Sequence, residues 1–79
     1  MGVRNYLIEM REKKQLPQQI VADEIGISRQ YYSAIEMGTR QKNMDITLIS
    51  ALAKFFAVSL EFIIERENEW KKQGKQAGE

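Results

Sequence analysis

One expected helix carries side chains whose types suit the edges of nucleic-acid bases. Within segment 28–37, a rotation of 100° per residue places Tyr32 and Ile35 on one side. The other side presents what we call the polar arc, namely Arg29, Gln30, Ser33 and Ala34. Arg can make two hydrogen bonds to guanine, and Gln can make two to adenine. Ser can act as a donor or as an acceptor, and an Ala methyl can contact the methyl of thymine. From the residue types alone, base reading in a DNA groove and an ordinary solvated helix face both remain open.

Other kinds of chemistry have little support in the composition. The 79 residues include no Cys and no His, so the chain forms no disulfide and lacks the usual zinc and iron ligands and the commonest general base. It has no glycine-rich loop that would cradle a phosphate, and no carboxylate, Lys, Ser or Tyr stands out as a catalytic group. We therefore expect neither an enzyme nor a cofactor.

Five helices joined by short links are expected to position the polar arc. The apolar spacing predicts helices at residues 2–14, 17–25, 28–37, 45–56 and 59–72. Pro17 suits the first position of the second helix, and Gly26 suits the left-handed residue that ends it. The expected N-caps of the last three helices are Ser28, Asp45 and Ser59. The sequence thus predicts one all-α domain over residues 1–72 and a disordered tail over residues 73–79.

The net charge does not point to a partner. Residues 1–43 hold seven basic and five acidic side chains, residues 44–79 hold five and six, and the total is +1. Charge alone favours an ordinary mixed surface over a nucleic-acid partner, so the placement of individual basic residues has to carry the case for nucleic-acid binding. No segment reaches the roughly 18 apolar residues of a membrane span, and the first ten residues do not form a signal peptide, so we expect a cytoplasmic protein with no membrane partner.

Four stretches of the sequence resemble the lambda-repressor-like family of helix-turn-helix regulators, also called the Cro/CI or xenobiotic-response-element type. They are 10–18 (MREKKQLPQ), 21–29 (VADEIGISR), 32–40 (YSAIEMGTR) and 52–60 (LAKFFAVSL). The family's second helix, its turn and its third helix are matched by the middle two stretches. Because the spacing agrees over several separate motifs, the resemblance covers residues 3–65 as a whole.

The resemblance implies roles for particular positions. The polar arc falls on the base-reading positions of the family's recognition helix, and Gln18 matches a Gln that contacts backbone phosphate and braces that helix. Arg11 and Glu36 match a salt bridge between the first helix and the end of the third. The loop positions that lie along the phosphates are matched by Arg40, Lys42 and Asn43. Phosphate contacts position a protein on DNA but carry no sequence information.

Two further sets of residues each have two interpretations. Tyr31 flanks the buried side of its helix, and its hydroxyl either contacts a phosphate or belongs to a side chain that only packs. The surplus apolar residues of the last two helices are Leu48, Phe55 and Phe62. These three either complete a small core or form a two-fold dimer interface.

The resemblance leads to a functional expectation. We expect a transcriptional regulator that binds double-stranded DNA, acting as a homodimeric repressor on a palindromic operator whose half-sites lie about 10 bp apart. The alternative is a protein-interaction module, such as a toxin-binding antitoxin or the partner of an anti-repressor. The modest net charge and the apolar Ile20, at a position where the family usually has a polar residue, favour this alternative slightly.

Overall fold

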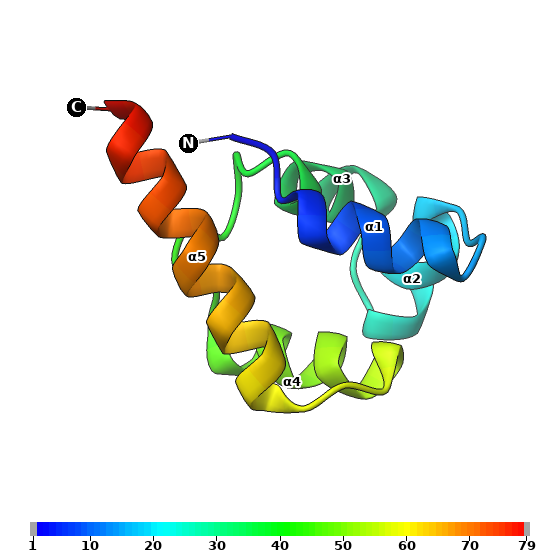
Figure 1. Ribbon diagram of the computed structural model, residues 1–79. Coiled ribbons are helices and arrows are strands. Elements are labelled where there is room, and N and C mark those ends of the chain that lie inside the picture. Colours follow the sequence, from blue (N-terminus) through cyan, green and yellow to red (C-terminus); the bar gives the residue numbers. More distant parts are fainter. Residues whose placement is uncertain (1, 79) are drawn as a thin grey trace.

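The chain folds into five α-helices, and the computed structural model describes residues 2–78, with side chains described as far as residue 73 (Figure 1). The helices are α1 (Asn5–Lys13), α2 (Gln18–Ile25), α3 (Arg29–Glu36), α4 (Ile46–Phe56) and α5 (Leu60–Gly78). Residues 2–78 form no strand, and the all-α prediction is confirmed. The last helix, α5, runs past its predicted end at residue 72. The side chains beyond residue 73 lie outside the described part of the chain, so the disordered tail over residues 73–79 stays a prediction.

Short-range hydrogen bonds start three of the helices. The Ser28 side chain accepts from the backbone N–H of Tyr31 at 3.1 Å, and Asp45 accepts from Leu48 at 2.8 Å. Ser59 accepts from the backbone N–H of Phe62 at 3.0 Å, so the three predicted caps are confirmed. Pro17 differs from its prediction. It is the N-cap of α2 with an extended ψ of 159° and lies one residue before the first helical position.

Two glycines with left-handed backbones end α2 and follow α3. Gly26 has φ 79° and is the C-cap of α2, as predicted. Gly38 has φ 80° and lies so close to the backbone of Gly2 and to the Trp70 ring that a Cβ at this position would collide with both. The second glycine is therefore required by conformation and by space together.

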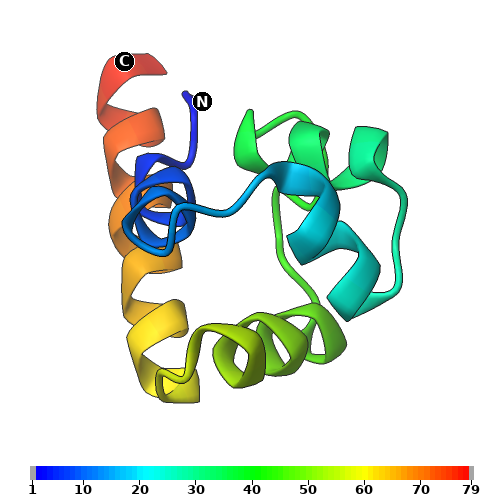
Figure 2. The ribbon, with the colours of Figure 1, turned by 90° about the vertical axis from the view of Figure 1, so that its right-hand side faces the viewer.

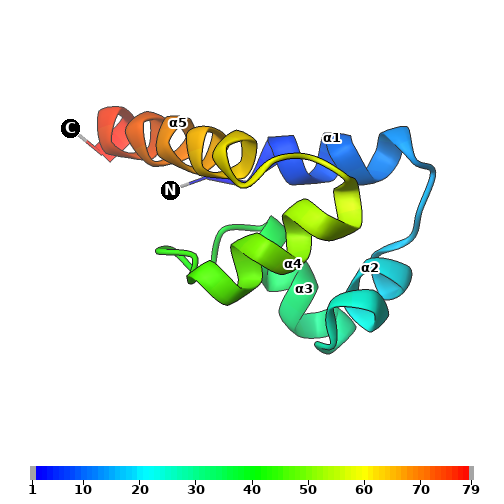
Figure 3. The ribbon, with the colours of Figure 1, turned by 90° about the horizontal axis from the view of Figure 1, so that it is seen from below.

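A single core joins all five helices. Its fully buried apolar side chains are Leu7 of α1, Val21 and Ala22 of α2, Tyr32 and Ile35 of α3, Leu52 of α4 and Ile63 of α5. In Figure 2, α1 and α5 lie on one side, α2 and α3 lie on the other, and α4 runs beneath both pairs. Figure 3, the view from below, shows α4 crossing in front of α3. This arrangement leaves the outer face of α3 without a covering helix.

None of the described helices is alone long and apolar enough to cross a membrane. Among the described helices, α4 and the first part of α5 are together long and apolar enough for a span, but the two are bent by 116° relative to each other.

Candidate nucleic-acid interface

The polar arc lies on the outer face of α3. Arg29 and Gln30 are exposed, and Ser33 and Ala34 are half-buried. On the opposite side of the helix the side chains of Tyr32 and Ile35 are fully buried and fix its rotation in the core. The inner face therefore sets the direction in which the outer face presents its polar groups.

Gln18 joins the start of α2 to both ends of α3. Its side-chain nitrogen donates to Oε1 of Glu36 at 2.9 Å, and its side-chain oxygen accepts from Nη1 of Arg29 at 3.5 Å. The first contact is partly buried and the second is exposed. Gln18 is thus placed to brace α3, and its contact with a backbone phosphate stays a prediction.

Glu36 also pairs with α1. Nε of Arg11 lies 2.7 Å from Oε2 and Nη2 lies 3.1 Å from Oε1 of Glu36, which makes a two-point ion pair. The remaining nitrogen, Nη1, donates to the carbonyl oxygen of Leu16 at 3.0 Å. Such planar two-point pairing is the arrangement for which a guanidinium is best suited.

The electrostatics of this pair favour the charged carboxylate. The side chain of Glu36 is only 1% exposed. Burial alone would raise the pKa of the Glu36 carboxyl, but the Arg11 guanidinium, the neighbouring Tyr32 hydroxyl and the Gln18 amide together outweigh burial and hold its pKa below the ordinary value. Burial in turn raises the pKa of Tyr32, so its hydroxyl stays protonated beside that carboxylate.

The loop between α3 and α4, residues 37–45, carries the expected phosphate-binding residues. All three are exposed: Arg40, Lys42 and Asn43. Within this loop the Gln41 side chain donates to the Tyr31 hydroxyl at 2.8 Å and accepts from the backbone N–H of Asp45 at 3.1 Å. The Tyr31 hydroxyl therefore supports the loop, and a contact with phosphate stays a prediction.

Sequence reasoning missed a buried ion pair between the N-terminus and α5. Arg4 is fully buried, and its Nε lies 2.6 Å from Oε2 of Glu67, which is 4% exposed. Tyr6 donates to the same carboxylate oxygen at 2.5 Å, and the Arg4 guanidinium lies 4.1 Å from the centre of the Trp70 ring. The available signal was Glu67 itself, because it shares an apolar stripe of α5 with Ile63 and Trp70.

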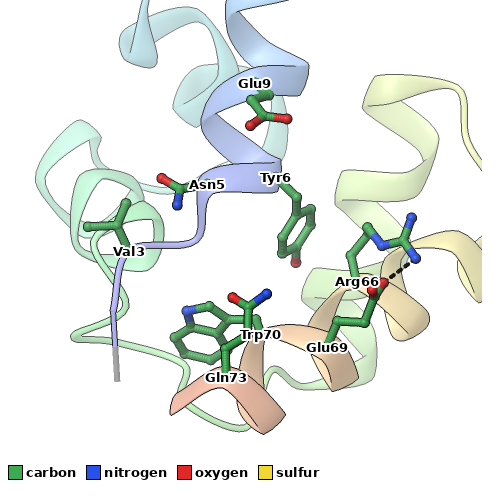
Figure 4. Close-up of a pocket in the computed structure, with 8 residues that line it drawn as sticks. All are labelled: Val3, Asn5, Tyr6, Glu9, Arg66, Glu69, Trp70 and Gln73. Carbon is green, nitrogen blue, oxygen red and sulfur yellow. Dashed lines mark hydrogen bonds and ion pairs between the residues drawn. The ribbon is translucent and has the colours of Figure 1, made fainter. Parts of the chain in front are cut away.

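Beside this pair, α1 and α5 enclose a shallow cleft of about 350 Å³ (Figure 4). Tyr6 and Trp70 project into it from opposite helices, while Arg66 and Glu69 pair with each other at its edge. The other residues that line it are Val3, Asn5, Glu9 and Gln73. Among the described residues no group of three or more acidic side chains could hold a metal ion.

The three candidates for a dimer interface differ in how deeply their side chains are buried. Leu48 is 8% exposed and belongs to the monomer core, so for this residue the core is the interpretation that holds. Phe55 and Phe62 are half-buried and pack against the same core. The exposed apolar side chains of α5 are instead Leu60 and Ile64, at 43% and 39%, which we call the α5 strip.

Comparison with known proteins agrees with this geometry. A family model described as "Helix-turn-helix" (HTH_3) matches residues 7–63, so the chain belongs to the Cro/CI-type family of helix-turn-helix transcriptional regulators. A relative from Bacillus subtilis (strain 168), named "Uncharacterized HTH-type transcriptional regulator YqaE", is 37% identical over 62 residues. That match covers 78% of this chain but 52% of the relative, so the chain spans about half of the relative's length. No solved structure gives a significant match.

Proposed function

We propose that the protein is a sequence-specific repressor that binds a palindromic operator as a homodimer. The observation that carries the proposal is the outer face of α3, where Arg29 and Gln30 are exposed and the Gln18 brace lies beside them. Arg and Gln are the side chains best suited to bidentate contacts with guanine and adenine in the major groove. The bound dimer would act by occupancy, without catalysis and without a cofactor.

The loop after α3 supplies the contacts that position the helix. Exposed Arg40, Lys42 and Asn43 follow the recognition helix directly, and basic and amide groups there suit phosphate oxygens. The start of α2 at the half-buried Gln18 offers a second phosphate contact, because the free N–H groups of a helix N-terminus favour anions. Binding of this kind should weaken steeply as salt rises.

The α5 strip supports the homodimer in this proposal. Leu60 and Ile64 lie one turn apart and border α4 residues that include Ala53 and Ile49. Two exposed apolar side chains on one helix, next to a second helix, suit a two-fold contact in which each copy buries the same patch of the other. A dimer of this kind would present two recognition helices to half-sites about one turn, or 10 bp, apart.

Selection of bound sequences from a random duplex library, at a salt concentration of about 0.15 M, tests the proposal. We expect enrichment of a palindrome whose half-sites lie one helical turn apart. Recovery of half-sites without a fixed spacing would contradict the dimer and leave the base reading intact. Weak, salt-sensitive binding with no consensus would contradict the whole proposal and favour a protein-interaction module.

A further inference from the structure

The buried Arg4 reaches three backbone carbonyls as well as Glu67. Its Nη1 donates to the carbonyl oxygens of Ile35 at 2.6 Å and Arg40 at 3.1 Å, and its Nη2 donates to that of Gln41. Nε and Nη2 donate to the two carboxylate oxygens of Glu67. These five hydrogen bonds equal the five N–H donors of a guanidinium, so Arg4 has no donor left for DNA. We call this arrangement the Arg4 clamp.

The carbonyls that Arg4 holds belong to the DNA-facing part of the molecule. Ile35 lies in the last turn of α3, where helix carbonyls lack partners within the helix and favour a positive charge. Arg40 and Gln41 belong to the loop that carries the exposed basic residues. Because one rigid guanidinium binds both segments, it holds the path of the loop relative to α3, together with the backbone bonds from Thr39 and Arg40 to the carbonyl oxygen of Ala34.

The clamp is anchored outside the helix-turn-helix. The backbone N–H of Arg4 donates to the carbonyl oxygen of Glu36 at 2.7 Å, and Trp70 donates from Nε1 to the carbonyl oxygen of Gly2 at 2.8 Å. The residues just before α1 thus lie between α5 and the end of α3. Figures 1 and 2 both show the segment just before α1 near the C-terminal half of α5.

Stability alone is a weak reason for such a pair. Replacing a buried ion pair by apolar residues of similar volume is often neutral or stabilising, because desolvation offsets the attraction between the charges. A guanidinium that satisfies three carbonyls from two segments does something that an apolar pair cannot do, since it sets the geometry of those segments.

We propose that Arg4 is a positioning residue for DNA binding, which holds the loop 37–45 and the end of α3 in register and is itself held by Glu67 of α5. The proposal rests on the DNA binding proposed above. It gives α5 a role in operator recognition without any contact between α5 and DNA.

The decisive variant is the double substitution Arg4→Met/Glu67→Met. It removes both charges together, so no unpaired charge stays buried, and the long apolar side chains fill the space beneath Trp70. The matched control is Arg66→Met/Glu69→Met, which removes an exposed ion pair from the same helix. Each protein is compared with the parent in urea unfolding, in amide exchange without DNA, and in affinity for the selected operator over a range of salt.

We expect the double variant to fold and its core amides in α4 to keep their protection. The amides of Thr39 and Arg40 donate to the carbonyl oxygen of Ala34 at 3.0 and 3.3 Å, and their exchange should accelerate by about tenfold or more, since the loop loses the guanidinium that holds the carbonyls of Arg40 and Gln41. Operator affinity should fall by about tenfold, and the slope of log affinity against log salt should become shallower by about one for each phosphate that the loop no longer reaches. The control should match the parent in every measurement.

Unchanged loop exchange, or an unchanged affinity and salt slope in a folded double variant, would overturn the proposal. If the double variant does not fold, Arg4→Lys decides, because Lys keeps a positive charge beside Glu67 but has a single nitrogen that cannot reach all three carbonyls. Parent-like operator binding by Arg4→Lys would equally overturn the proposal. If the parent selects no DNA sequence, the proposed function fails, and loop exchange in the free protein still tests whether the clamp holds the loop.

Discussion

The side-chain nitrogen of Gln18 donates a 2.9 Å hydrogen bond to Oε1 of Glu36. Gln18 is the first residue of α2 and Glu36 is the last of α3, so the bond joins the beginning of one helix to the end of the next. The oxygen of the same amide accepts from Arg29 at the start of α3. One side chain therefore contacts both ends of α3.

Gln18→Ala should weaken operator binding by about tenfold, or roughly 1.4 kcal/mol, because it removes the brace and the proposed phosphate contact together. Its neighbour provides the control. Gln19 is exposed and bonds only to Asp23 of its own helix, so Gln19→Ala should bind like the parent. Titration of labelled operator measures both. Equal affinities for the two variants would show that the brace contributes nothing to binding.

Gln30→Ala should relax discrimination at one base pair of each half-site by about 1–3 kcal/mol, because the variant can no longer make a bidentate contact to a base edge. Lys42→Ala is the contrasting variant. Removal of a phosphate-binding side chain should weaken binding to all sequences alike and reduce the salt slope by about one. Affinities for a panel of single-base operator variants measure both effects. A parent-like pattern of discrimination in Gln30→Ala would rule out base reading by this residue.

The two left-handed glycines should differ in their tolerance of Ala. At Gly26 a Cβ meets nothing within 4 Å, so Gly26→Ala should cost only the conformational strain of about 1–2 kcal/mol. At Gly38 the same Cβ would collide with the carbonyl oxygen of Gly2 and lie 2.9 Å from Cζ2 of Trp70. Gly38→Ala should therefore cost about 1–3 kcal/mol more. Urea unfolding measures the free energy of unfolding of both variants. Equal losses of stability would mean that the segment around Gly2 shifts to make room for the Cβ without a further loss of stability.

Local features were predictable from the sequence because their causes lie within a few residues. The caps at Ser28, Asp45 and Ser59 each depend on a side chain and an N–H three residues later. The polar arc follows from helix rotation alone. Such features need no knowledge of how the helices pack. The contact between Arg11 and Glu36 joins two helices and depends on their packing, and it was predictable only through the family resemblance.

The features that were missed depend on packing. Arg4 and Glu67 lie 63 positions apart, and nothing near either residue indicates its partner. Leu48 remained a candidate for a dimer surface as well as for the core because it lies on a second apolar face of α4. That helix packs against α2 as well as α5, so both of its apolar faces are internal. The exposed apolar residues of α5 could be identified only once the packing of α4 was known.

Glu36 should make the stability of the protein depend on pH in the acid range. Its folded-state pKa lies below the ordinary value of 4.5, so its contribution is fully present above that value. As the pH falls from about 4.5 through the lower folded pKa, protonation favours the unfolded chain and the contribution is lost. The free energy of unfolding, measured in urea at a series of pH values from 7 to about 3, should therefore decline at the acid end.

Glu36→Gln should remove much of this decline, at the cost of lower stability at pH 7, because Arg11 loses its ionic partner. Glu9→Gln removes an exposed carboxylate of α1 and serves as the control for a general change in net charge. A decline in Glu36→Gln as steep as in the parent would assign the acid sensitivity to other groups.

The α5 strip supplies the last prediction, which concerns assembly. Leu60 and Ile64 remain exposed although every helix of the monomer has packed its core, so burying them requires a second copy in the proposed dimer. Ile64→Glu places a charge in that contact and should raise the dimer dissociation constant by about tenfold or more, because the charge loses water without gaining a partner. Sedimentation equilibrium measures the change without DNA.

Ile20→Glu, the control, makes the same substitution at an exposed Ile of α2 and should leave the dissociation constant unchanged. If the two variants assemble alike, the two-fold contact lies elsewhere. If only Ile64→Glu dissociates, its operator affinity should fall toward that of a single half-site while its base preference stays that of the parent, because assembly and base reading use different helices.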